Sequence, residues 1–395
     1  MSERRMRRGK IPASLYRVDL ARIIFLPHRR DDPAMTSREI ALHRLVNQQI
    51  ASSTCASPGE VVSRLGAMQA QDYLGALWAV GLRSPGTTEA DVEKALARRE
   101  IVRTWPMRGT LHFVAAADAR WMLELLTPRV IAASATRHQQ LELDQNVFAR
   151  SEKIFRKVLG GGQQRTREDM MGLLESAGIS TANQRGYHIL WLLAQQRVLC
   201  FGPRQGKQQT FVLFEEWIPQ SRSLPREEAL AELALRYFAS HGPATLADFA
   251  GWSGLKITEA RRALASVSSR LTEDEFEGSS YWMPPSSQNI PSNLSQTAFL
   301  LPGFDEYLLG YKNRTAVLSS QHAPFIIPGN NGMFQPTMVK GGKVIGVWKR
   351  SSPKNAAAIS AQPFAPLSAG DTRGFSVAAK HYGRFIGVAG MTFSA

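Results

Sequence analysis

Cysteine is scarce in this sequence: only Cys55 and Cys200 occur in 395 residues. Two cysteines cannot build a disulfide framework, and neither belongs to a Cys-x-x-Cys pair or to a Cys/His cluster with zinc-ligand spacing. We therefore expect no structural metal and a reducing, cytoplasmic environment.

Long apolar runs are missing as well. No stretch approaches the roughly 18 apolar residues that a membrane-spanning helix requires, and the run 23–26 is too short for the apolar region of a signal peptide. Membrane insertion and export are therefore not expected. With 44% hydrophobic and 21% charged residues, the composition is that of a folded protein. The length predicts two or three domains of about 150 residues each.

Common catalytic signatures are absent too. The sequence contains no G-x-x-x-x-G-K-[ST], no G-x-G-x-x-G after a strand, no H-E-x-x-H and no G-x-S-x-G. The sequence therefore lacks the usual markers of nucleotide hydrolysis, dehydrogenation and zinc proteolysis. No cofactor is expected. A nuclease is disfavoured because the acidic residues do not cluster as they do in a metal site.

Acidic residues are few relative to basic ones, since 33 Asp and Glu stand against 48 Lys and Arg for a formal charge of +15. This balance favours a polyanionic partner such as nucleic acid. Residues 1–34 hold nine basic and four acidic side chains and predict a disordered basic tail. An over-extended gene start is the alternative, because Met35 is followed by a helix start with Glu39 placed as in a capping box.

Three segments repeat one pattern, helices followed by two short strands: 35–145, 146–222 and 223–290. The helices are expected at 42–46, 61–68, 74–80, 90–98, 151–159, 166–174, 187–194, 227–239, 245–250 and 258–267. The strand pairs are expected at 101–105 with 110–114, 198–201 with 211–214, and near 271 with 281–283. This order is typical of the winged helix, a DNA-binding helix-turn-helix variant. The sequence predicts an α+β, mainly α fold with three tandem winged-helix domains.

A Pro/Ser/Asn-rich linker at 284–295 precedes a C-terminal unit, residues 296–395. This unit is expected to be β-rich, with strands at 325–327, 333–339 and 344–348.

The predicted second and third wings differ in charge. Arg204 and Lys207 lie at the tip of the second wing, where we expect them to bind DNA phosphates. The third wing carries acidic side chains that phosphates would repel, so we expect it not to face DNA; these are Glu273, Asp274, Glu275 and Glu277.

Three longer motifs point to a family. Residues 67–73 read AMQAQDY, residues 104–112 read TWPMRGTLH, and residues 301–314 read LPGFDEYLLGYKNR. In this order they resemble motifs of the AlkZ/YcaQ family of bacterial winged-helix DNA glycosylases, and the match runs from about Arg38 to the C-terminus. The resemblance implies a C-shaped array of three winged helices with a β-rich C-terminal unit. It further implies excision of N7-alkylated guanine from double-stranded DNA, in some members from interstrand crosslinks, with Gln69 and Gln71 as the catalytic pair.

The proposed chemistry needs no carboxylate base. A purine alkylated at N7 is already cationic, so the enzyme must stabilise an oxocarbenium-like sugar and align water rather than protonate the base. Gln69 and Gln71 point the same way on an extended or turn segment and diverge on a helix. Alternatively, the two glutamines satisfy backbone groups at a helix junction. Asp72 is expected to cap the next helix rather than act as a general base.

The second motif adds further candidates. Arg108 is expected at the tip of the first hairpin, where it either reaches a phosphate or the minor groove or is a solvated turn residue. His112 lies on the same strand face as Thr110 and is either at the lesion or a hydrogen-bonded scaffold histidine. Trp105 and Phe113 are expected to pack inward.

The third motif predicts one structural pair and one DNA contact. Asp305 and Arg314 are expected to form an ion pair that locks the C-terminal unit onto the array. Tyr307 is expected to face the DNA groove.

Two functions fit this sequence. One is a monofunctional DNA glycosylase acting on cationic alkylpurines, which would associate with the nucleoid. The other is a winged-helix DNA-binding protein without catalysis, a regulator or repair accessory. Regulators usually dimerise to read palindromes, whereas three unequal copies without a dimer helix favour a monomer around one site, and so favour the glycosylase.

Overall fold

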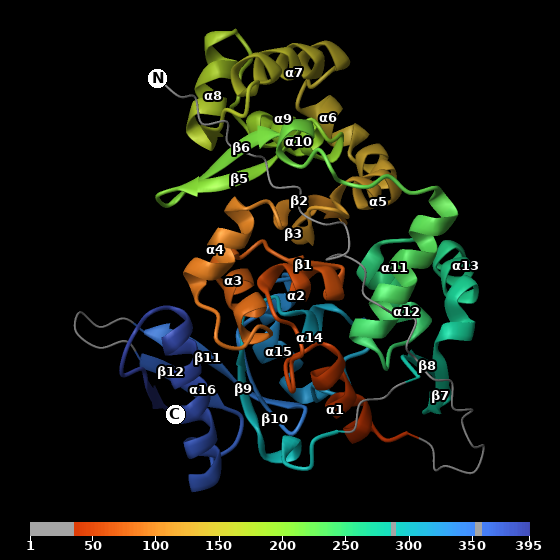
Figure 1. Ribbon diagram of the computed structural model, residues 1–395, viewed down its shortest axis with the longest axis vertical. Coiled ribbons are helices and arrows are strands. Elements are labelled where there is room, and N and C mark those ends of the chain that lie inside the picture. Colours follow the sequence, from red (N-terminus) through yellow and green to blue (C-terminus); the bar gives the residue numbers. More distant parts are fainter. Residues whose placement is uncertain (1–34, 286–289, 352–357) are drawn as a thin grey trace, which may run out of the picture.

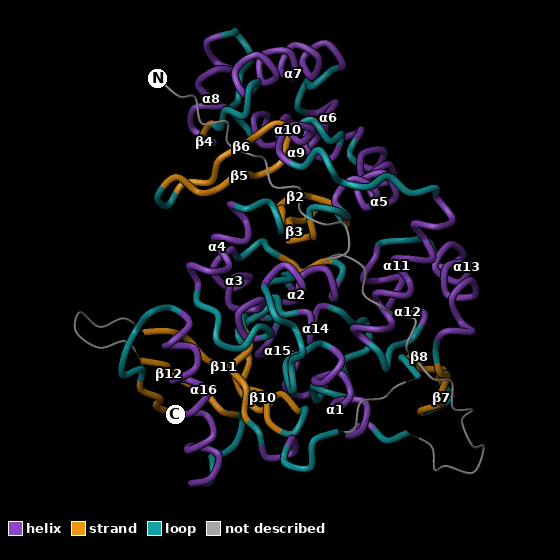
Figure 2. The backbone as a smooth tube through the Cα atoms, in the orientation of Figure 1, coloured by secondary structure: helices purple, strands orange, loops and turns teal. Residues whose placement is uncertain are grey.

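The computed structural model of the protein describes residues 35–285, 290–351 and 358–395. The predicted basic tail, residues 1–34, and residues 286–289 of the predicted linker lie outside this part of the chain. The fold is mixed α+β, and its strands form small separate sheets among the helices (Figure 2). None of the described helices is long and apolar enough to cross a membrane.

The first unit begins where its sequence predicts. Thr36 and Glu39 form a reciprocal capping box, with Glu39 N donating to Thr36 Oγ1 at 3.2 Å and Thr36 N donating to Glu39 Oε2 at 2.8 Å. The elements of this unit are α1 (Ser37–Asn47), α2 (Pro58–Leu65), β1 (Ala67–Gln69), α3 (Tyr73–Leu82), α4 (Glu89–Ala97), β2 (Ile101–Met107) and β3 (Thr110–Ala115). Figure 1 places them at the centre of the molecule.

The second and third units likewise consist of helices followed by a two-stranded hairpin. Two helices, α5 (Ala119–Ala133) and α6 (Ala135–Gln140), lead to the second unit at the top of Figure 1. It comprises α7 (Gln145–Leu159), β4 (Arg165–Thr166), α8 (Arg167–Ser176), α9 (Arg185–Gln195), β5 (Leu199–Gln205) and β6 (Gln208–Leu213). After α10 (Phe214–Trp217), the third unit comprises α11 (Arg226–His241), α12 (Leu246–Ser253), α13 (Ile257–Val267), β7 (Thr272–Phe276) and β8 (Ser279–Met283).

The repeat extends to a detail that the sequence did not reveal. In every unit a short extended segment precedes the last two helices before the hairpin and pairs with that hairpin. This segment is β1 in the first unit, β4 in the second and the Ala244–Trp282 bridge in the third. The first two hairpins also share a bulge at a proline, Pro106 and Pro203, because proline cannot donate to the strand ladder.

The C-terminal unit contains a five-stranded sheet in the order β13-β12-β11-β10-β9. Its elements are β9 (Ala298–Leu301), α14 (Glu306–Leu309), α15 (Ala323–Ile326), β10 (Thr337–Lys340), β11 (Lys343–Ser351), β12 (Ala358–Pro363), α16 (Ala369–Phe385) and β13 (Thr392–Ser394). The strand predicted at 325–327 is wrong, since this segment lies at the end of α15. Pro324 occupies the first turn of α15, where its fixed φ favours a helix, and three apolar residues alone do not distinguish helix from strand.

The β2–β3 hairpin lies inside the molecule, and every residue of β2 is buried. Its side chains enter three hydrophobic cores. Ile101 and Phe113 belong to the core shared with the C-terminal unit, and Val102 and Val114 to the core shared with the third unit. Trp105 and Leu111 belong to the core shared with the second unit. The inward packing predicted for Trp105 and Phe113 is therefore confirmed. Because one hairpin contributes to all three cores, it fixes the position of the neighbouring β1 relative to every other unit.

Candidate active site

Gln69 is the last residue of β1, and Gln71 lies two residues beyond it, in the bend that leads to α3. The pair therefore lies outside a helix, as predicted. Gln69 is half-buried and Gln71 is exposed. The first hairpin is within reach, because Leu111 N donates to Gln71 Oε1 at 3.4 Å. Both side chains are therefore at least partly accessible beside this hairpin.

The backbone between the two glutamines is held on both sides. Ala70 N donates to Leu111 O at 2.8 Å, and Ala70 O accepts from Arg103 Nε and Nη2 at 3.1 and 2.8 Å. Asp72 then accepts from Gly75 N at 3.2 Å as the N-cap of α3, as predicted. Groups other than the two amide side chains thus make the shorter contacts to this segment. The amide oxygens add longer contacts of 3.4 Å, because Gln69 Oε1 accepts from Gln71 N and Gln71 Oε1 accepts from Leu111 N.

Arg103 is a site residue that the sequence reasoning missed. Its side chain is buried, and the guanidinium carbon lies 5.1 Å from the ring centre of Tyr73 and 4.9 Å from that of Phe201. Burial lowers the pKa of Arg103 to about 10, so the group stays charged at neutral pH. The available signal was a lone arginine inside an otherwise apolar strand.

We predicted that Arg108 projects from the hairpin tip, but it does not. Its φ of 53° and that of Gly109, 72°, make a two-residue turn, and its side chain folds back so that Nη1 donates to Trp252 O in α12. Nη2 lies 3.3 Å from His112 Nε2. The tip is covered by the third unit, so the guanidinium that we expected to reach a phosphate joins two units instead.

His112 is fully buried, which places it in the scaffold rather than at an accessible surface. Because Arg108 can only donate, Nε2 of His112 must accept, and Nδ1–H donates to Thr110 O at 2.9 Å. Burial and the charge of Arg108 lower the pKa of His112 to about 3. The ring is therefore neutral at physiological pH and has no proton to give to a leaving base.

Glu306 is a second residue that the sequence reasoning missed. Its buried carboxylate accepts from Gln69 N through Oε1 at 2.9 Å and from Trp252 Nε1 through Oε2 at 3.0 Å. Oε2 also lies 3.5 Å from His241 Nε2. Burial opposes ionisation, yet the contact with His241 and the nearby charge of Arg108 lower the pKa of Glu306 to about 2. Only its place in the 301–314 motif could have drawn attention to it.

The structure corrects the ion pair expected in the third motif. Asp305 pairs with Arg83 of α3, through contacts of 2.8 and 2.7 Å, and not with Arg314. Arg314 Nε instead donates to Leu308 O at 2.7 Å within the C-terminal unit. The predicted lock between this unit and the first one exists, but with a different basic partner.

Tyr307 also departs from expectation, because its side chain is fully buried and cannot face a DNA groove. Its hydroxyl donates to Gly342 O at 2.7 Å and lies 3.1 Å from Ala41 O. The aromatic ring belongs to the core between the first and C-terminal units. Tyr307 is therefore a packing residue.

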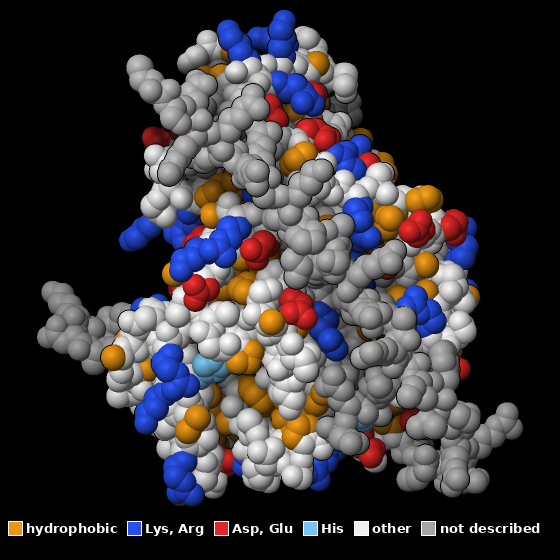
Figure 3. Space-filling view, in the orientation of Figure 1, with side chains coloured by type: hydrophobic (Ala, Val, Ile, Leu, Met, Phe, Trp, Pro, Cys, Tyr) orange, Lys and Arg blue, Asp and Glu red, His pale blue; other side chains and the backbone are white. Residues whose placement is uncertain are grey.

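The two basic side chains of the second hairpin differ in their surroundings. Lys207 is exposed, whereas Arg204 Nη1 lies 3.2 Å from Glu93 Oε1 and its guanidinium carbon lies 5.0 Å from the ring centre of Tyr73. The hairpin tip approaches α3 and α4, where basic and acidic side chains mix on the face shown in Figure 3. Glu273, Glu275 and Glu277 of the third hairpin are exposed.

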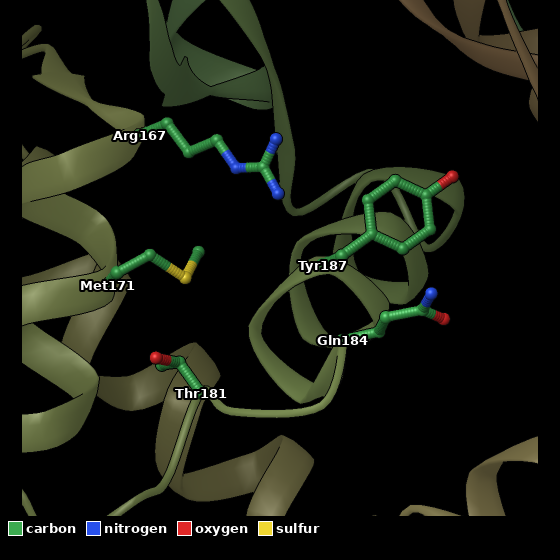
Figure 4. A pocket seen from close by; sticks show the side chains of 5 residues that line it. All are labelled: Arg167, Met171, Thr181, Gln184 and Tyr187. Atoms are coloured by element: carbon green, nitrogen blue, oxygen red, sulfur yellow. The ribbon is translucent and has the colours of Figure 1, made fainter.

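A cavity of about 560 Å³ lies in the second unit between α8 and α9. Figure 4 shows Arg167 and Met171 projecting from α8 towards it, Gln184 and Tyr187 on the opposite side, and Thr181 below Met171. The lining contains neither a carboxylate nor either of the two glutamines. Among the described residues, no group of three or more His, Cys, Asp or Glu side chains is arranged to hold a metal ion.

Comparison with known proteins decides the family. Residues 62–385 match the family described as DNA glycosylase AlkZ-like. The chain belongs to the AlkZ-like DNA glycosylase family. The matched range covers most of the chain and includes the glutamine pair, the first hairpin and Glu306.

A curated relative and a solved structure agree with this membership in the AlkZ-like family. The interstrand DNA cross-link repair glycosylase of Streptomyces sahachiroi is 28% identical over 335 residues, 79% of this chain and 87% of the relative. The structure of the S. sahachiroi DNA glycosylase AlkZ superposes with a TM-score of 0.76 at 24% identity, over 92% of this chain and all of that one. The AlkZ-like protein described here is a DNA repair glycosylase, and DNA is its partner.

Proposed function

We propose that this glycosylase removes N7-alkylated, cationic purines from double-stranded DNA, acting as a monomer. The observation that carries the proposal is the glutamine pair: Gln69 ends β1, Gln71 follows in the next bend, both are accessible, and backbone contacts position the segment between them. Two neutral amide groups suit a leaving base that already carries positive charge, because such a base needs no proton. The neutral, enclosed His112 fits the same chemistry.

We propose the following reaction steps. The C1′–N9 bond breaks and its electron pair goes to the purine, which leaves as a neutral base. Gln69 and Gln71 oxygens stabilise the positive charge that develops on the sugar and orient a water molecule. Water adds to C1′ and its proton passes to solvent, which leaves an abasic site.

The architecture supports a larger arrangement for DNA binding. The three repeated units fit winged helices at 35–145, 146–222 and 223–290, set in a C-shaped array around the duplex, with 296–395 as the C-terminal unit. Because the curated relative is named for cross-link repair, interstrand crosslinks are a further substrate to test. A DNA substrate would place the protein at the nucleoid.

Incubation with an N7-methylated duplex tests this function. We expect release of free N7-methylguanine and, in parallel, an equal amount of alkali-labile abasic sites in the DNA. Undamaged duplex of the same sequence is the control. Tight binding of the methylated duplex with no release of any base would instead support a non-catalytic binding protein.

The second hairpin gives a separate prediction about DNA affinity. Replacing the exposed Lys207 with alanine should weaken binding to every duplex sequence alike and reduce the slope of log K against log salt by about 0.9, the value for one phosphate contact. Arg204→Ala should have a smaller effect, because Glu93 already neutralises this guanidinium.

Salt titrations of DNA binding check this prediction, with Lys380→Ala on α16 as the control, because that exposed lysine lies in a different unit. Equal slopes for the Lys207→Ala and Lys380→Ala variants would show that the second hairpin does not contact phosphate.

A further inference from the structure

A closed circuit of contacts lies behind the strand that carries the glutamine pair. Gln69 N donates to Glu306, and Trp252 Nε1 donates to the same carboxylate. The carbonyl oxygen of Trp252 accepts from Arg108, which in turn contacts His112. His112 pairs with Gln69 in the β1–β3 register and closes the circuit. The circuit joins the first, third and C-terminal units.

Glu306 occupies the place of a missing strand. β1 is an edge strand in the order β1-β3-β2. Ala70 N points inward to β3, so the neighbouring N–H of Gln69 points to the free edge. A buried N–H without a partner costs about 1–3 kcal/mol. The carboxylate of Glu306, which is 237 positions away in the sequence and belongs to the C-terminal unit, accepts the hydrogen bond from this N–H.

The same carboxylate is also the negative charge of the circuit. Arg108 folds inward to meet Trp252 and His112, and His112 is neutral. An uncompensated guanidinium at this depth would oppose positive charge on a sugar bound at Gln69 and Gln71. Glu306 is ionised at physiological pH and offsets that field.

We propose that Glu306 is a positioning residue for catalysis, which fixes the free edge of the Gln69 strand and compensates the buried charge of Arg108. The inference rests on the proposed function for its effect on rate. Its effect on the strand does not, because the contact between Glu306 and Gln69 N exists whatever the lesion. The two parts can therefore fail separately.

Amide hydrogen exchange tests the positioning directly. Glu306→Ala should speed exchange in the segment 67–71 by at least about tenfold, since the edge N–H of Gln69 loses its acceptor. Glu306→Gln should have a smaller effect, because its amide oxygen can still accept one hydrogen bond. Asp118→Asn is the control. Asp118 is also buried and accepts from an indole, that of Trp121, at 3.0 Å, and its other partners are Arg222 and Arg236 rather than β1. Unchanged exchange in 67–71 for Glu306→Ala overturns the proposal.

Single-turnover excision of N7-methylguanine tests the consequence for catalysis, well below the unfolding temperature of every variant. We expect Glu306→Gln to lower the rate at saturating enzyme at least about tenfold with little change in Kd for DNA, and Asp118→Asn to leave both near the parent values. Equal losses in the two variants would indicate a general stability effect and overturn the proposal. If the parent releases no base, the proposed function fails, while hydrogen exchange still decides whether Glu306 holds the strand.

Discussion

Replacing both Gln69 and Gln71 with alanine should lower the rate of N7-methylguanine excision by on the order of 100-fold or more. The lost amide oxygens would act chiefly in the transition state, where positive charge develops on the sugar. The shorter backbone contacts of this segment do not depend on the two side chains, since Gln69 N bonds to Glu306 and Ala70 pairs with Leu111 and Arg103. The variant loses only the two longer contacts of 3.4 Å that the amide oxygens accept, from Gln71 N and Leu111 N. The strand should therefore keep its place in the variant.

DNA binding by the same double variant should hardly change. Neutral side chains release no counterions, so the affinity for undamaged duplex and its salt slope should stay near the parent values. The matched control is a second double variant, Gln139→Ala with Gln140→Ala. It also removes two glutamines, but these are exposed on α6, about 70 positions from the Gln69 segment. Excision at the parent rate by the Gln69/Gln71 variant would remove these residues from the mechanism.

Gln71→Asp refines this test. The aspartate keeps acceptor oxygens and adds negative charge beside the developing cation, so we expect it to retain part of the activity. Activity as low as that of the double alanine variant would show that the longer reach of glutamine is essential.

Removing the carboxylate of Asp305 should cause the largest loss of stability. Arg83 is fully buried, and its guanidinium donates to both oxygens of Asp305 at 2.8 and 2.7 Å. Asp305→Ala would leave this charge buried and unpaired, which typically costs about 3–5 kcal/mol. Because Asp305 lies in the C-terminal unit and Arg83 in the first, we expect earlier unfolding in thermal and urea melts together with loosened contact between these units.

Two comparison variants make the stability prediction specific. Arg314→Ala should cost much less than Asp305→Ala, because Arg314 bonds only within its own unit, to Leu308 O. Glu152→Ala removes the partly exposed i,i+4 pair with Arg156 on α7 and should cost only about 0.3–0.5 kcal/mol. A melt of Asp305→Ala that matches that of Glu152→Ala would contradict a dominant role for the buried pair.

Local features of this protein followed from the sequence because their causes are local. The capping box of Thr36 and Glu39 and the N-cap at Asp72 involve residues three positions apart. The non-helical segment at Gln69 and Gln71, the hairpin strands and most helices likewise follow from the spacing of nearby residues. The motif order was enough to point to the family that the comparison confirms.

The mistaken predictions about site residues share one cause, which is contact between distant parts of the chain. Arg108 was expected at an open tip, but the third unit covers that tip through Trp252, 144 positions away. Asp305 was paired with the near Arg314, yet it binds Arg83 at a separation of 222 positions. Tyr307 was expected at a surface but is buried. No sequence pattern shows which face of the short α14 another unit will cover.

The sequence by itself thus determined the repeated helix-and-hairpin units, the non-helical glutamine pair and the basic character that suits DNA. Only the tertiary structure decided what surrounds that pair: Arg103 on Ala70, Glu306 on the free edge of β1, and a neutral His112 behind it. Charge compensation and burial depend on groups brought together from separate units. A one-dimensional pattern carries spacing along the chain, whereas these effects depend on distances across the folded core.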